Sequence, residues 1–139
     1  MRRALEADHR ELHAYLEGRV RLLLAPNLQA ARADPTPLPV YAPGSLRVVR
    51  TPSENLDRLG AVARAFHRLG VSALRPELCG LRQTRGSGLV LDARLVHLDA
   101  FARVTGASDL SYYVERGPFG LRTAMVEIGR CPAYALAFG

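Results

Sequence analysis

The stretch TPSENLDRLGAVARAFHRLGVSALRPELCGLRQ, residues 51–83, decides the fold because the spacing of its apolar residues changes after Gly70. Before Gly70 the apolar residues recur every three or four positions, which indicates one face of a helix. After Gly70 apolar and polar residues alternate, which is typical of a strand. At the start, Thr51 suits an N-cap, Pro52 suits the first helical position, and Glu54 is predicted to close a capping box onto Thr51. Gly70 suits the position just after a helix end.

The segment before this stretch is predicted to be mostly helical. Over residues 3–24 the apolar residues recur on one helical face: Leu5, Leu12, Leu16, Val20 and Leu23. Pro26 ends or kinks this helix. A short second helix is predicted over 27–34, whereas residues 34–44 contain four prolines, which exclude a regular helix. A short strand is predicted at 45–50.

The segment after residue 70 is predicted to consist of strands joined by turns. The strand at 71–83 contains Pro76, which suggests a sheet edge. The strand at 89–99 alternates, and one of its faces carries Leu89, Leu91, Ala93, Leu95 and His97. Strands at 109–116 and 121–128 are partly apolar on both faces, so both faces need a cover. Helices followed by a run of antiparallel strands predict an α+β fold, with helices on one face and a second subunit on the other.

Length and composition predict a single folded domain over residues 1–139, because hydrophobic residues make up 48% of the chain. The net charge is +6, but every basic residue is an arginine and they are spread along the chain. This bias is typical of a GC-rich genome and, without a basic tract, does not indicate nucleic-acid binding. The charged start of the chain and the lack of a long apolar run argue against secretion and against a membrane partner, so a cytoplasmic protein is expected. Cys79 and Cys131 are expected to be reduced thiols, and no cofactor is expected.

Four segments of this chain carry a resemblance to a known superfamily. They are VYAPGSLRVVRTPSE (40–54), FHRLGVSALRPELCGLRQ (66–83), LVLDARLVHLDA (89–100), and SYYVERG with LRTAMVEI (111–117 and 121–128). In this order they resemble the nuclear-transport-factor-two-like superfamily, which includes SnoaL-like polyketide cyclases and ketosteroid isomerases. The resemblance implies N-terminal helices packed on a curved antiparallel sheet, the cystatin-like cone. It also implies a pocket on the concave face of the sheet and pairing of two copies through the sheet.

The first helix carries His9 and His13 with Glu11 between them, which raises the question of a metal site. Zinc peptidases use H-E-x-x-H or H-x-x-E-H so that the glutamate reaches the metal-bound water. Here the order is H-x-E-x-H, and Glu11 points away from the face that the two histidines share. His9 also falls on the leucine stripe of this helix. We therefore predict no metal site.

Three residues are predicted to contact a ligand in such a pocket. His97 extends an apolar strand face near a strand end, where a neutral imidazole can act as a base or a hydrogen-bonding group. Tyr112 lies on the more apolar face of its strand. Tyr15 flanks the apolar stripe of the first helix, where ketosteroid isomerases have a tyrosine that helps stabilise an enolate. Asp34 follows the short second helix, where the resemblance implies a catalytic base, although ADPTP also fits a simple turn after a helix.

These observations leave three functions open. The chain is predicted to bind a small, largely apolar ligand between the helices and the concave sheet. A second hypothesis is an enzyme of the SnoaL or ketosteroid isomerase kind, acting on a small hydrophobic carbonyl compound with Asp34 or His97 as base. A third is a structural homodimer module without a ligand. A buried carboxylate or histidine near Tyr15 favours the enzyme, a cavity of roughly several hundred Å³ favours the binding protein, and a filled core favours the structural module.

Overall fold

Gly70, where the spacing of apolar residues changes, lies at the boundary between helix and sheet with a φ of 76°. Glycine adopts a positive φ without steric cost, so the helix ends here. The computed structural model describes residues 8–139 except 85 and 87. Its elements are, in chain order, α1 (His9–Leu24), α2 (Leu28–Ala33), β1 (Leu38–Ala42), β2 (Ser45–Val49), α3 (Pro52–Arg68), β3 (Ala73–Gln83), β4 (Leu89–Leu98), β5 (Val104–Gly117), β6 (Gly120–Ile128) and α4 (Pro132–Phe138).

The start of α3 is capped as predicted, with one change of partner. The Oγ1 of Thr51 accepts a hydrogen bond from the backbone N–H of Glu54 at 3.1 Å. The Oε2 of Glu54 accepts a hydrogen bond at 2.8 Å from the backbone N–H of Arg50. The predicted closure of Glu54 onto Thr51 is therefore wrong by one residue, because the extended backbone of Thr51 brings the preceding N–H within reach.

The first helix is capped by Asp8, whose Oδ1 accepts a hydrogen bond from the backbone N–H of Glu11 at 2.8 Å. Leu5 and the other residues before Asp8 that were predicted to be helical lie outside the described residues. His9 is exposed, so its predicted place on the buried stripe is wrong: the first turn of α1 extends past the sheet. No helix in the described part of the chain is long and apolar enough to cross a membrane.

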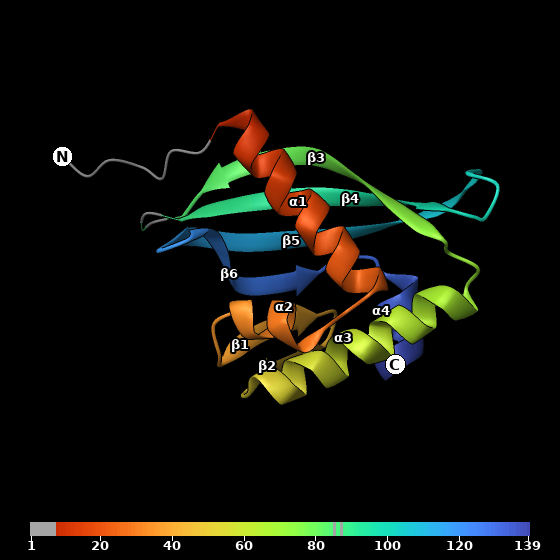
Figure 1. Cartoon of the computed structure of the whole chain (residues 1–139), viewed down its shortest axis with the longest axis horizontal. Helices are drawn as coiled ribbons and strands as arrows, with labels where there is room; N and C mark the ends of the chain where they lie inside the picture. The colour runs from red at the N-terminus through yellow and green to blue at the C-terminus, as the bar shows by residue number, and fades with distance from the viewer. Residues whose placement is uncertain (1–7, 85, 87) are drawn as a thin grey trace.

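The six strands form one curved sheet in the order β2-β1-β6-β5-β4-β3 (Figure 1). Neighbouring strands run antiparallel except β1 and β6, which pair in parallel with Val40 opposite Val126. β3 is an edge strand, as Pro76 predicted, because a proline cannot donate a hydrogen bond to a further strand. The predicted α+β fold with N-terminal helices on a curved sheet is confirmed. The sheet is mixed because the proline-rich segment forms β1, which pairs in parallel with β6. The sequence analysis did not predict this strand, since its prolines are not typical of one.

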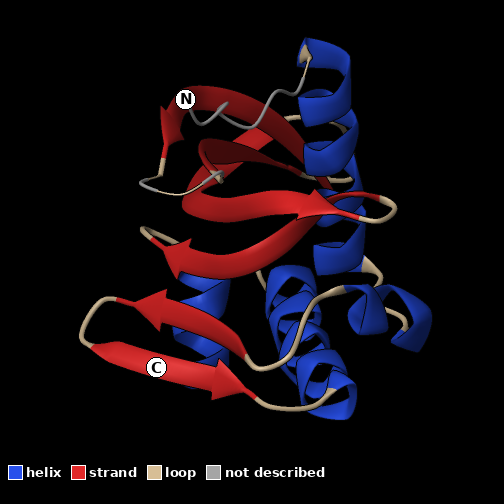
Figure 2. Cartoon of the chain, turned by 90° about the vertical axis from the view of Figure 1, so that its left-hand side faces the viewer, coloured by secondary structure: helices blue, strands red, loops and turns tan. Residues whose placement is uncertain are grey.

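The helices lie against the concave side of this sheet. In Figure 1, α1 crosses the sheet and α3 lies beside α2 and α4; Figure 2 shows the strands curving around the helices. Leu16 of α1 and Phe66 of α3 are almost completely buried in one core cluster with Leu91 and Leu95 of β4. The C-terminal helix α4, which the sequence analysis did not predict, packs on α3 and closes this end of the core.

The convex side of the sheet is polar. Three ion pairs join neighbouring strands there: Arg82–Asp92, Arg94–Asp109 and Arg122–Glu115. The two valines of β4 on this side, Val90 and Val96, are only 3% and 7% exposed. Pairing of two copies through this side stays a prediction.

Candidate functional site

A small cavity lies in the core, between the helices and the concave face of the sheet. Its free volume is about 10 Å³, close to the space that one water molecule needs. Most of its wall is apolar, with Leu23 from α1, and Val62 and Phe66 from α3. Its polar groups come from Arg19, Arg58 and Tyr112. The space is far smaller than the predicted binding cavity, so the core of this conformation is nearly filled, which by the criterion given above favours the structural module.

A chain of hydrogen bonds holds the polar side of the cavity in place. The Nη1 of Arg19 donates to the Oδ1 of Asp34 at 2.7 Å. The Nδ2 of Asn55 donates to the Oδ2 of Asp34 at 3.0 Å and to the backbone oxygen of Ala31 at 3.1 Å. The Nη2 of Arg58 donates to the Oδ1 of Asn55 at 2.9 Å. Each oxygen of the Asp34 carboxylate therefore accepts one hydrogen bond. Arg58 has no direct bond to this carboxylate and is linked to it only through the side-chain amide of Asn55.

All the charged members of this network are buried. Arg19 is 8% exposed, Asp34 5% and Arg58 6%, and Asn55 between them is completely covered. Buried charges in proteins are normally matched by an opposite charge, because removal from water is costly. Here one carboxylate faces two guanidinium groups, which leaves one excess positive charge beside the cavity.

Three polar atoms at the cavity have no hydrogen-bond partner among the described residues: the Nε of Arg19, the Nε of Arg58 and the hydroxyl oxygen of Tyr112. The guanidinium carbon of Arg19 lies 5.3 Å from the centre of the Tyr112 ring. Buried polar groups in folded proteins nearly always have a partner. Three such atoms on the wall of one cavity therefore mark it as a place where a polar group can bind.

Burial and neighbouring charges shift the pKa values of these groups in opposite directions. Burial, together with the positive charge of Arg19, lowers the pKa of Arg58 to about 10. Burial also opposes the charge of Arg19, but the adjacent Asp34 carboxylate prevails and raises the pKa of Arg19. Burial raises the pKa of the Tyr112 phenol. At neutral pH the cavity thus has two cations and a neutral hydroxyl group.

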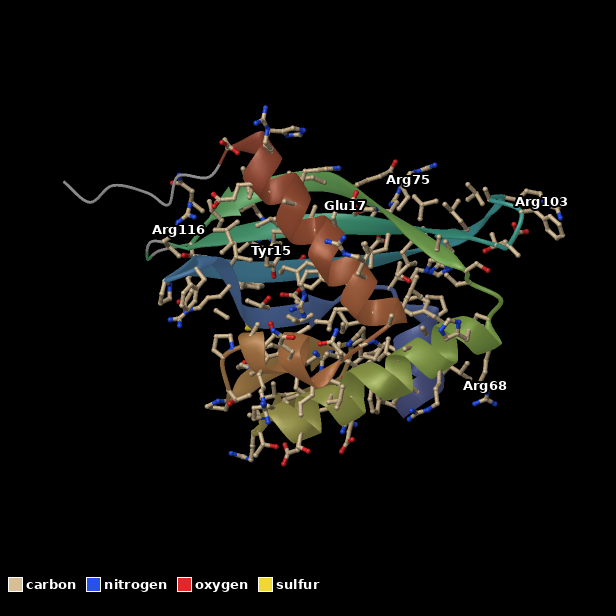
Figure 3. All side chains as sticks on the ribbon, viewed as in Figure 1. Tyr15, Glu17, Arg68, Arg75, Arg103 and Arg116 are labelled. Carbon is tan, nitrogen blue, oxygen red and sulfur yellow. The ribbon has the colours of Figure 1, made fainter. Side chains whose placement is uncertain are left out.

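Tyr15 and Tyr112, two of the predicted ligand contacts, lie side by side. Their ring centres are 5.9 Å apart in an edge-to-face arrangement, and Tyr15 projects from α1 toward the sheet (Figure 3). The hydroxyl group of Tyr15 is hydrogen-bonded to the Oγ1 of Thr123 at 2.5 Å. Burial raises the pKa of Tyr15. Tyr15 is therefore a partnered neighbour of the cavity, whereas Tyr112 lines it and its hydroxyl oxygen has no well-formed hydrogen bond among the described residues.

The two candidate bases lie apart from each other. Asp34 is beside the cavity but is held by Arg19 and Asn55. His97 is 5% exposed, its Nε2 is 2.7 Å from the Oγ of Ser108, and its ring packs edge-on against Phe66 at 5.5 Å. Burial lowers the pKa of His97. His97 lines a separate shallow depression with Arg94 and Asp109 instead of the cavity at Tyr112.

A larger groove lies beside the small cavity. It has a volume of about 340 Å³ and is bordered by β1, β2, the end of β6, and α4. Ile128, Cys131 and Tyr134 line both the groove and the cavity. Tyr134 belongs to α4 and is 7% exposed. A movement of α4 or of the Tyr134 side chain would therefore join the two spaces.

Sequence reasoning missed Arg19, Asn55 and Arg58. Each occupies a position on the apolar face of its helix, where the neighbours in helical spacing are leucine, valine and phenylalanine. A charged residue at such a position was the available signal. The sequence analysis used only the apolar members of these stripes. The partner of Arg19 could not be read from the spacing, because Asp34 lies in a different part of the chain, whereas Asn55 and Arg58 are one turn apart on α3.

The histidines of α1 do not form a metal site with their neighbours. The rings of His9 and His13 are stacked with centres 6.3 Å apart. The Nε2 of His13 lies 3.4 Å from the Oε1 of Glu17 in an exposed pair. Within residues 8–139, leaving out 85 and 87, no group of three or more histidine, cysteine or acidic side chains is arranged to hold a metal ion.

Comparisons with known proteins bear on the fold. No protein-family model matches the sequence, and no curated protein matches it significantly. Among solved structures, a cystatin-like protein of unknown function from Nostoc punctiforme is similar, with a TM-score of 0.66, 12% identity, and 94% and 96% of the two chains covered. Aln2 from a Streptomyces species is similar with a TM-score of 0.65 and 13% identity over 91% and 94% of the chains.

A ketosteroid isomerase-like protein from Erwinia carotovora has a TM-score of 0.58 and 13% identity over 89% of this chain and 98% of its own. Identities this low leave the residues of a site unassigned, since one fold hosts many functions. What the similarity establishes is the arrangement of helices and strands. The chain has the cystatin-like cone fold of the nuclear-transport-factor-two-like proteins.

Proposed function

We propose that this chain binds a small, largely apolar molecule between its helices and the concave face of its sheet. The observation that carries the proposal is the set of three unpartnered polar atoms, among the described residues, on an otherwise apolar cavity wall. Ligand sites are typically apolar pockets with a few convergent polar groups that orient the ligand. Arg19, Arg58 and Tyr112 are such groups, and each comes from a different element.

A nearly filled core taken alone favours the structural homodimer module, so a binding role requires that α4 opens. Tyr134 stands between the cavity of about 10 Å³ and the groove of about 340 Å³. A ligand that displaces the Tyr134 ring gains the space of both, which is within the range of small-molecule sites. The conformation described above is then the closed, ligand-free one, and α4 is the element that opens.

The enzyme hypothesis has less support at this site. A general base must have a free oxygen or nitrogen within hydrogen-bond reach of the substrate. Asp34 is paired with Arg19 and Asn55, and neither Asp34 nor His97 lines the cavity. A binding role uses the same cavity without requiring either group to be free.

Binding can be tested with N-phenyl-1-naphthylamine, a neutral dye whose fluorescence rises in apolar surroundings. We expect a saturable rise with the wild-type chain and tighter binding by Tyr134→Ala, because the smaller side chain joins the two spaces. Leu136→Ala is the matched control, since Leu136 lies on the same helix but is 46% exposed. Absence of saturable binding by both the wild type and Tyr134→Ala refutes the proposal.

We also propose that the chain acts as a homodimer in the cytoplasm. The convex side of the sheet has no helix over it in the described residues, and a second copy is the cover expected for it. Cys79 and Cys131 are free thiols, which suits a reducing compartment. Sedimentation velocity at micromolar concentration should give a dimer, and a monomer contradicts the pairing.

A further inference from the structure

The charge at the cavity is unbalanced, and this indicates the chemistry of the ligand. Arg19 and Arg58 are both at least nine-tenths buried, and Asp34 is the only buried carboxylate in the described residues. Asp34 accepts from Arg19 directly, whereas Arg58 has only the amide oxygen of Asn55. An amide orients a guanidinium group but does not neutralise it. Arg58 therefore makes no direct ion pair among the described residues and shares the one nearby carboxylate, Asp34, with Arg19, which leaves one excess positive charge.

The free donors belong to three side chains that line the same cavity. The Nε of Arg19, the Nε of Arg58 and the hydroxyl group of Tyr112 have no hydrogen-bond partner in the described part of the chain. An arginine side chain can only donate hydrogen bonds, and a phenol can donate one. A group that satisfies all three must accept hydrogen bonds from several directions. A carboxylate does so with two oxygens and about four lone-pair directions.

A water molecule satisfies this site less well than an anion. The free space of about 10 Å³ holds roughly one water, which could accept two of these hydrogen bonds. Water leaves the excess charge in place, and a charge in apolar surroundings is costly without an opposite one. Guanidinium groups pair with carboxylates through short, charge-assisted hydrogen bonds. The rest of the wall, including Leu23, Val62 and Phe66, favours a hydrocarbon body.

We infer that the ligand of this cavity is a small organic anion, with a carboxylate held by Arg58, Arg19 and Tyr112 and an apolar body directed toward the groove behind α4. This inference rests on the proposed function and names the class of ligand for it. Arg58 supplies the counter-charge, and Arg19, already paired with Asp34, and Tyr112 supply further donors. Tyr134 occupies the path along which the apolar body extends.

The test compares two molecules that differ only in the head group, octanoate and 1-octanol. Binding is measured by calorimetry at pH 7 and low chloride, on the wild type and on Arg58→Gln. The control is Arg68→Gln, which removes one exposed arginine from the same helix and so matches the change in net charge (Figure 3). We expect the wild type and Arg68→Gln to bind octanoate at least about tenfold more tightly than 1-octanol. In Arg58→Gln this preference should disappear while 1-octanol affinity is kept.

Three further measurements distinguish a loss of ligand contacts from a loss of folding in the variant. Tyr112→Phe removes only a hydroxyl group and should weaken octanoate about fivefold with little change for 1-octanol. In a proton–nitrogen NMR spectrum, the Nε–H signal that is missing in Arg58→Gln should shift with octanoate and stay in place with 1-octanol. Circular dichroism melting of each variant confirms that it is folded before binding is compared.

Each alternative result has a separate meaning. Equal affinity for octanoate and 1-octanol overturns the anion inference and leaves the proposed function intact. A preference for octanoate that persists in Arg58→Gln also overturns it, because the carboxylate is then held elsewhere. If the wild type and Tyr134→Ala bind neither molecule nor the neutral dye, the proposed function fails and the inference fails with it.

Discussion

The two buried arginines should respond in opposite directions to the same substitution. Arg58→Met removes a buried charge that has no carboxylate partner among the described residues, whereas Arg19→Met removes the partner of Asp34. Methionine keeps an unbranched side chain in each place and adds no charge. The pair of variants therefore separates the effect of an unmatched charge from the effect of a broken ion pair.

The size of the gain at Arg58 follows from its pKa. Burial and the charge of Arg19 lower that pKa to about 10, between two and three pKa units below the usual value of an arginine. One pKa unit corresponds to about 1.4 kcal/mol, so keeping the charge buried costs on the order of 3 kcal/mol. Because the folded pKa is the lower one, this cost is fully present at every pH below about 10, including pH 7. It is relieved only as the pH rises from there toward the usual pKa of an arginine.

The loss at Asn55 offsets part of this gain. Arg58→Met leaves the Oδ1 of Asn55 without its donor, which costs about 1 kcal/mol. The net stabilisation is then about 2 kcal/mol, or a rise in Tm of roughly 8 °C for a chain of this size. Arg19→Met instead leaves the buried Asp34 carboxylate short of a counter-charge, which costs about 3 kcal/mol or more.

Urea denaturation and thermal melting at pH 7 measure both changes. The expected result is a higher midpoint for Arg58→Met and a lower midpoint for Arg19→Met, each with an unchanged dependence on urea concentration. A fall in Tm for Arg58→Met as large as that for Arg19→Met refutes the reasoning, because Arg58 would then be a stabilising part of the core. A rise in Tm for Arg58→Met means that Arg58 does not serve stability and favours a functional role, since residues at functional sites often reduce stability.

Three further predictions test the elements around the site. Tyr15→Phe leaves the buried hydroxyl group of Thr123 without its partner and should lower the free energy of unfolding, measured in urea, by about 1–2 kcal/mol. Adding Thr123→Val should recover part of this loss. If the losses of the two single variants simply add, the two hydroxyl groups do not stabilise the fold through a hydrogen bond. Thr51→Ala removes the N-cap of α3 and should cost about 1 kcal/mol, whereas an unchanged midpoint means that the cap is redundant. Burial lowers the pKa of His97 from 6.5, so the unfolded chain takes up this proton first as the pH falls through 6.5, and stability drops. His97→Gln should lose less stability than the wild type between pH 7.5 and 5.5, and equal losses exclude His97 as a source.

The parts of the fold that sequence analysis predicted are those set by local spacing. The apolar stripe of α3, its cap at Thr51 and its end at Gly70 depend on residues within one or two helical turns of each other. The alternation in β4 likewise needs only neighbouring residues. β1 escaped prediction because its prolines are poor strand formers, and its place beside β6 depends on a parallel pairing with a strand far along the chain.

The candidate site was predicted only in part for the same reason. Tyr15 and Tyr112 were found from their positions on apolar faces, and the fold places their rings 5.9 Å apart. Asp34 was chosen by resemblance as a base, but its contacts with Arg19 and Asn55 make it a counter-charge in this conformation. His97 was expected in the same pocket, but its ring packs edge-on against Phe66 and it lines a different depression.

The sequence by itself determined the first three helices, the long strands and the class of fold, because each depends on periodicity and on capping or turn residues that act over a few positions. Only the tertiary structure decided that Arg19 of α1 meets Asp34 after α2, that Asn55 joins them, and that Arg58 is left beside Tyr112 without a carboxylate among the described residues. The balance of charge inside a core depends on which distant side chains are buried together. This balance of charge cannot be predicted from a local sequence pattern. The excess positive charge that results is the feature that points to an anionic ligand.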